Sequence, residues 1–204
     1  KSNISVIANN IEKYLTFSVD KIQFIDICQF MPGSLETLAK TLSEFPITDS
    51  YWNDRPQVKD LVHQKNFFPY DWLDSLGKFE ETSLPPIDDF SSVLHSANGE
   101  LARTSEDDYN HARKAWNVTG CKTFGDYHDF YLLTDVLITA DLFEKFRNTC
   151  LANFKLDPAN YVSSPSMCWD ALLKQTGQPL ELLTDTNMYL FFERGIRGGI
   201  SGCS

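Results

Sequence analysis

The sequence predicts an α/β fold with a change of structural unit near residues 150–160. Segment 21–30, KIQFIDICQF, is rich in Ile and Phe and is typical of a strand. Segments 33–45 and 124–149 instead repeat apolar residues with the period of a helix. With 204 residues, of which 42% are hydrophobic, the chain is long enough to bury a substantial core.

The first half begins with a mixed pattern. Segment 4–15 is expected to form a helix, because its large aliphatic residues fall on one helical face (Ile4, Ile7, Ile11 and Leu15). Strand 21–30 follows. Segment 33–45 is then expected to form a helix with a continuous apolar stripe (Leu35, Leu38, Leu42 and Phe45). Segment 46–104 is less regular and contains most of the prolines, so we expect two short helices there.

The second half carries clear helix boundaries. The residues SEDD at 105–108 resemble a capping box and predict a helix through Trp116. A long helix is expected at 124–149. Ser164 is the expected N-cap of a further helix, with Pro165 in its first turn and Gly177 past its end. A last helix ends at Gly195, and the residues after it are expected to turn into a strand.

Charge and cysteine content limit the function classes. The formal net charge of −10 taken alone argues against a nucleic-acid-binding protein, but it leaves open one that holds metal ions with carboxylates. The five cysteines are scattered and lack zinc-ligand spacing, which favours reduced thiols and an intracellular protein. No apolar run approaches the length of a membrane span, so no membrane partner is expected.

Within YHDFYLLTDVL, at 127–137, a carboxylate falls inside an apolar helical pattern. Tyr131 and Asp135 are four residues apart and share a helix face, with Tyr127 one turn earlier. An Asp can bind Mg²⁺, and a Tyr hydroxyl can hold a water or a phosphate oxygen. Two-metal phosphodiester hydrolysis needs several carboxylates, so Asp135 alone cannot form such a site. Alternatively, Asp135 faces solvent and Tyr131 packs in the core.

Four short motifs occur in a fixed order: SLETL from Ser34, with Leu35; KNFF from Lys65; the Tyr131–Asp135 pair; and IRGG at 196–199. Together they resemble family B DNA polymerases, most of all the protein-primed branch found in some phages, linear plasmids, adenoviruses and large DNA transposons. The resemblance covers nearly the whole chain. It implies a partial RNase-H-like exonuclease domain at 1–152, followed at 153–204 by linker helices and the start of a polymerase palm.

The resemblance also implies roles for individual residues. Asp135 would bind Mg²⁺ or Mn²⁺ in a 3′–5′ editing site, and Tyr131 would orient the attacking water. Ser34 and Leu35 would hold the single-stranded 3′ end of DNA, and Lys65 would contact a phosphate. Three residues would touch the primer or template backbone (Arg197, Gly198 and Gly199).

Each of these roles has a simpler alternative. Ser34 would be only a helix N-cap, Leu35 a core residue and Lys65 a solvated surface lysine. Gly198 and Gly199 would simply form a turn. Ile196 replaces the tyrosine of the family's motif, so any contact made by that tyrosine is lost.

The remaining catalytic motifs of the family are missing. Asp26 lies on the expected strand, but Cys28 stands where the first exonuclease motif has a Glu. The expectation is therefore an internal segment of a DNA-directed DNA polymerase, inactive by itself, whose parent would bind DNA, dNTP and a priming terminal protein. It would act in the nucleus of a eukaryotic host, or otherwise in the cytoplasm or with a virus. The alternatives are an inactive polymerase-derived interaction module and an unrelated α/β domain.

Overall fold

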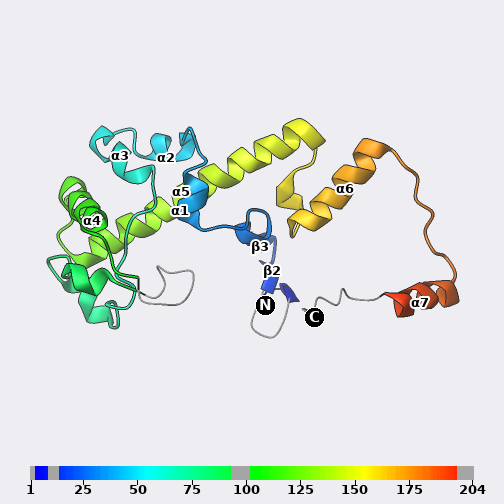
Figure 1. The fold of residues 1–204 in the computed structure, drawn as a ribbon, viewed down its shortest axis with the longest axis horizontal. Coiled ribbons are helices and arrows are strands. Elements are labelled where there is room, and N and C mark those ends of the chain that lie inside the picture. Colours follow the sequence, from blue (N-terminus) through cyan, green and yellow to red (C-terminus); the bar gives the residue numbers. More distant parts are fainter. Residues whose placement is uncertain (1–2, 9–13, 93–101, 197–204) are drawn as a thin grey trace, which may run out of the picture.

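The computed structural model describes residues 3–8, 14–92 and 102–196. It is mixed α/β, as expected, with one small antiparallel sheet and a larger helical part (Figure 1). The strands are β1 (Ile4–Ala8), β2 (Tyr14–Val19) and β3 (Ile22–Ile25). The α-helices are α1 (Leu35–Ala39), α2 (Pro46–Tyr51), α3 (Lys59–Val62), α4 (Glu106–Thr119), α5 (Phe124–Phe154), α6 (Ser164–Thr176) and α7 (Thr186–Gly195).

Helix α5 is a long helix that runs through the helical part of the molecule, with α1 to α4 beside it (Figure 1). It begins at a capping box, in which the Thr123 hydroxyl accepts from the Asp126 amide and the Asp126 carboxylate accepts from the Thr123 amide. It ends at Lys155, whose φ of 58° lies in the left-handed region. The long helix expected at 124–149 is confirmed and extends to Phe154. The domain boundary placed after residue 152 stays a prediction.

Two buried clusters hold α1 to α4 against α5. The larger one joins α4 and the segment around 58–90 to the first two turns of α5 (Val58, Leu61, Val62, Phe68, Phe90, Ala112, Ala115, Phe124, Tyr127, Phe130 and Tyr131). The smaller one joins α1 and the residues after it to the middle of α5 (Ala39, Leu42, Phe45, Ile138 and Leu142). The stretch of α5 from Phe124 to Leu142 is therefore packed against neighbouring segments near both of its ends.

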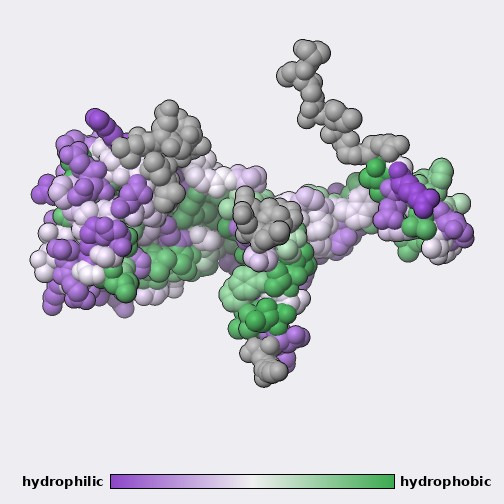
Figure 2. All heavy atoms as spheres, turned by 90° about the horizontal axis from the view of Figure 1, so that it is seen from below, coloured by the Kyte–Doolittle hydropathy of each residue, from purple (hydrophilic) through white to green (hydrophobic). Residues whose placement is uncertain are grey.

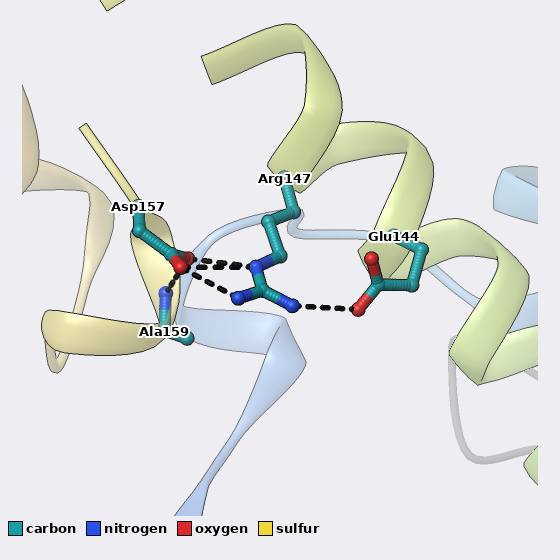
Figure 3. A network of polar contacts seen from close by, with 4 residues as sticks. All are labelled: Glu144, Arg147, Asp157 and Ala159. Atoms are coloured by element: carbon teal, nitrogen blue, oxygen red, sulfur yellow. Dashed lines mark hydrogen bonds and ion pairs between the residues drawn. The ribbon is translucent and has the colours of Figure 1, made fainter. Parts of the chain in front are cut away.

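Two charged side chains of α5 fasten neighbouring segments. Asp141 is buried and accepts hydrogen bonds from the amides of Ile47 and Thr48 (2.8 and 3.0 Å), which caps the start of α2. Near the end of α5, Arg147 binds Asp157 and Glu144, as Figure 3 shows. Since Asp157 also caps a short 3₁₀ helix, this network ties the turn after α5 back to the helix.

The helix expected at 4–15 is wrong. The chain forms β1 and β2 there, while residues 9–13 lie outside the described part. Strands β2 and β3 are joined by a two-residue turn in which Asp20 has φ +54°. The strand expected at 21–30 is shorter, because Asp26 accepts from the Cys28 amide and starts a 3₁₀ helix at Ile27.

One face of the sheet is entirely apolar. The strand register puts six side chains on that face (Ile4, Val6, Phe17, Val19, Ile22 and Phe24). The rings of Phe17 and Phe24 stack across the strands with centroids 4.4 Å apart, yet 41% and 46% of these residues stay exposed. Figure 2 shows this surface in green on the part that projects from the middle of the molecule.

The other expected helices differ in their bounds. The helix expected at 33–45 is wrong beyond Ala39, where α1 ends. Leu42 and Phe45 lie before α2, which begins at Pro46, and still pack into the smaller cluster. The helix starting after Ser105 is confirmed and extends to Thr119. Helix α6 has Ser163, not Ser164, at its N-cap. Helix α7 ends at Gly195 as expected, and none of the described helices has the length and apolar character needed to cross a membrane.

Candidate functional site

Helix α5 presents Tyr131 and Asp135 to the segment at 65–70, which lies between α3 and the 3₁₀ turns that follow. The Tyr131 side chain is buried, with 7% exposed, and its ring lies 4.7 Å from that of Phe68. Its hydroxyl shares a hydrogen bond with the hydroxyl of Tyr70. Tyr131 therefore faces a defined partner segment and not open solvent.

Asp135 is half-buried beside a positive charge. Its Oδ1 atom is shielded from water and has no hydrogen-bond partner within the described residues. Burial raises the pKa of the carboxyl above its usual value, whereas the Tyr131 hydroxyl and the charge of Lys65 lower it. The alternative, in which Asp135 faces solvent and Tyr131 packs in the core, is confirmed in one part and wrong in the other. Tyr131 does pack in the larger cluster, but Asp135 is half-buried and does not simply face solvent.

The Tyr131 phenol is held in its neutral form. Burial raises its pKa most strongly, and the hydrogen bond with Tyr70 and the nearby charge of Asp135 raise it further. A neutral phenol can donate one hydrogen bond and accept another. Tyr131 can thus orient a polar group but does not serve as an anion at neutral pH.

Ser34 and Leu35 lie at the start of α1. The Ser34 hydroxyl accepts from the Thr37 amide at 3.2 Å, so the simpler reading of Ser34 as a helix N-cap is confirmed. Leu35 is half-buried and packs against the smaller cluster. Neither observation tests contact with a DNA strand, which stays a prediction for both residues.

A polar hollow of about 500 Å³ connects α1 with Lys65. It lies between α1, the segment at 63–67 and the first turns of α4, and its charged lining includes Glu36, Lys40, Lys65, Asp107 and Asp108. Lys65 is half-buried there, not a fully solvated lysine. Glu36 of the first motif and Lys65 of the second therefore line one hollow, which includes neither Tyr131 nor Asp135. Arg197, Gly198 and Gly199 lie outside the described residues.

The described residues do not form a divalent-metal centre by themselves. No group of three or more His, Cys, Asp or Glu that could hold an ion occurs in the described ranges. Asp26 is occupied as a cap, since its two oxygens accept from the Cys28 amide at 3.0 Å and from the Gln29 side chain at 3.2 Å. The unpartnered oxygen of Asp135 fits one ligand position, but the chemistry of Mg²⁺ needs more oxygens than this.

Two residues of this region were not identified from the sequence. Tyr70 follows Lys65 by five residues, inside the aromatic run NFFPYDWL. Its hydroxyl is the one feature of this residue that could have marked it as a candidate for polar contacts. Asp141 is a second carboxylate in the apolar stretch of α5, and its partners at Ile47 and Thr48 are more than ninety residues away in the chain. Its position inside an apolar pattern was the signal that could have found it.

No protein-family model, curated protein or solved structure matches this chain.

Proposed function

We propose that this chain is part of a protein-primed family B DNA polymerase. Tyr131 and Asp135 would belong to its 3′–5′ exonuclease site, within an RNase-H-like domain that precedes the palm. One observation carries the proposal: Lys65, which the resemblance assigns to the same site, is the positive charge that acts on the Asp135 carboxyl. These two residues are seventy positions apart in the chain, and the fold brings Lys65 near enough for its charge to lower the pKa of the Asp135 carboxyl.

The residues of the site have chemistry suited to those roles. The neutral Tyr131 phenol can hold a water or a phosphate oxygen, and the Lys65 ammonium can pair with a phosphate. Asp135 offers an unpartnered oxygen for one Mg²⁺ or Mn²⁺. Further carboxylates of a two-metal centre would have to come from polymerase segments outside the described residues, so no metal-dependent step is assigned to these residues alone.

The test is binding of a fluorescent oligothymidylate, followed by anisotropy while the salt concentration is varied. We expect weak binding that falls as salt rises, with a slope reduced in Lys65→Met by about 0.7, the contribution of one single-strand phosphate contact. The control is Lys122→Met, because Lys122 is exposed beside the start of α5, away from the hollow. Absence of binding, or equal slopes for both variants, would contradict the proposal.

An interaction module derived from such a polymerase is the second candidate. The net charge of −10 and the uncovered apolar face of the sheet favour a protein-contacting surface over a DNA groove. This candidate predicts no salt-dependent binding of the oligothymidylate. Both candidates predict that the chain alone does not degrade a 5′-labelled strand with Mg²⁺ or Mn²⁺, and degradation abolished by Asp135→Ala would contradict both.

In the polymerase proposal, the partners of the intact protein are DNA, dNTP and a priming terminal protein. The place of action would be the nucleus of a eukaryotic host, or otherwise the cytoplasm or a virus. These assignments rest on the resemblance of the ordered motifs and not on any contact in the described residues.

A further inference from the structure

Tyr127 lies one turn before Tyr131 on α5 and has no part in the chemistry proposed above. Its side chain is fully buried, packed between Trp116 and Phe124. Its hydroxyl donates a hydrogen bond of 2.6 Å to the main-chain carbonyl of Phe67. Burial raises the pKa of this phenol, so it remains a donor throughout the physiological range.

The carbonyl that Tyr127 binds belongs to the segment facing the site. Phe67 follows Lys65 by two residues and precedes Tyr70 by three. One turn along α5, Tyr131 shares a hydrogen bond with Tyr70. One turn further, the charge of Lys65 lowers the pKa of the Asp135 carboxyl. Three successive turns of one helix face therefore act on the single segment 65–70.

Of these three interactions, only the bond from Tyr127 reaches the main chain. The other two act through the side chains of Tyr70 and Lys65, whose positions depend on where the segment's backbone lies. A partly buried carbonyl that loses its donor has a free-energy cost, so the segment would move to find another partner. The site geometry thus depends on a residue that need not touch any ligand.

We propose that Tyr127 is a positioning residue, whose bond to the Phe67 carbonyl sets the backbone of segment 65–70 and so aims Lys65 and Tyr70 at Asp135 and Tyr131. The placement of the segment is independent of what the protein binds. The consequence for a DNA strand rests on the proposed function.

The first test measures amide hydrogen exchange by NMR in Tyr127→Phe. This variant keeps the buried ring and removes only the hydroxyl. We expect exchange of the Tyr70 amide, which donates to the Phe68 carbonyl, to accelerate about tenfold, as expected when one supporting bond is lost. Exchange in α4 and α1 should stay unchanged, which a general loss of stability would not allow.

Tyr109→Phe is the matched control. The Tyr109 hydroxyl donates to the carbonyl of Pro85 at 2.9 Å, so this variant loses the same kind of bond at a segment that does not face the site. We expect no acceleration at Tyr70 in this variant. Equal acceleration in both variants, or none in Tyr127→Phe, would overturn the proposal.

The second test measures the salt dependence of oligothymidylate binding. We expect Tyr127→Phe to reduce the slope by about 0.7, as Lys65→Met does, and the double variant to reduce it no further. Additive reductions would overturn the proposal. If the wild-type chain binds no oligothymidylate, the proposed function fails, while the exchange result still decides whether Tyr127 positions the segment.

A backup covers a Tyr127→Phe variant that does not fold. Tyr70→Phe and Lys65→Met then each remove one side-chain interaction between the segment and α5. Because the Tyr127 bond to the Phe67 carbonyl is kept in both variants, we expect the NMR shift of the Phe67 amide to stay unchanged in each. A shifted Phe67 amide in Tyr70→Phe would overturn the proposal, because the bond between Tyr131 and Tyr70 would then place the backbone.

Discussion

The helical body around α5 and the sheet β1–β3 carry equally apolar patterns but use them differently. In the body, Phe130 is 5% exposed and lies beside the Trp52 ring. In the sheet, Phe24 is stacked on Phe17 and is still 46% exposed. An apolar stripe thus defines a face, but only a second packed layer turns that face into a core.

The helices differ among themselves in the same way, since some are packed against α5 and others are not. Helices α1 to α4 surround α5 with two buried clusters, whereas α7 buries none of its residues. The candidate site lies entirely within the covered body, at the junction of α5 and segment 65–70. Its geometry is therefore supported by packing that the sheet and α7 lack.

The largest expected effect is on stability, and one variant in each region compares the two directly. Phe130→Ala should lower the free energy of unfolding by about 3–5 kcal/mol, because it opens a cavity in the larger cluster. Phe24→Ala should lower it by about 1 kcal/mol or less, because it removes only an exposed cross-strand contact. Urea unfolding measures both, and equal losses would show that the sheet face is covered in solution.

A second prediction concerns Asp141, which fastens α2 to α5. Asp141→Ala should lower the free energy of unfolding by about 2–4 kcal/mol, since it leaves the partly buried amide of Ile47 and the buried amide and hydroxyl of Thr48 without their acceptor. Asp129→Ala, at an exposed position on the same helix, should change stability by no more than about 0.5 kcal/mol. Similar values for the two variants in urea unfolding would contradict the capping role.

A smaller, pH-dependent effect is expected at Asp135. Burial raises the pKa of the Asp135 carboxyl in the folded state, so the folded protein favours its neutral form. The stability that this neutral form contributes is fully present below the unfolded pKa. It is lost as the pH rises through the folded pKa and the carboxyl ionises. Asp135→Asn should therefore melt about 2–4 °C above the wild type near pH 7, with the gap closing near pH 4. A gap in melting temperature that is constant with pH would rule out this explanation.

Much of the helical body could be predicted from local signals. Ser105 and the capping box at Thr123 mark helix starts that need no distant partner. The sheet could not be predicted as easily, because Ile4, Ile7 and Leu15 satisfy a helical period as well. The better signal was the alternation of Phe17 and Val19 with Ile22 and Phe24 around a two-residue turn.

The site was predictable only in part. Tyr131 and Asp135 follow from spacing on one helix, and the resemblance adds Lys65. Tyr127 was also placed on that face, but its partner and the role of Tyr70 are visible only in the structure. A hydrogen bond to a hydroxyl or to the Phe67 carbonyl leaves no pattern in the sequence.

The central claim is that α1, segment 65–70 and the Tyr131–Asp135 face form one strand-binding site. The most direct measurement maps amide shifts by NMR while unlabelled oligothymidylate is added to the chain. We expect the largest changes near Ser34, in segment 65–70 and around Asp135, and small changes near Arg55 and Lys122. Changes centred on Arg55 and Lys122, or no changes at all, would contradict the claim.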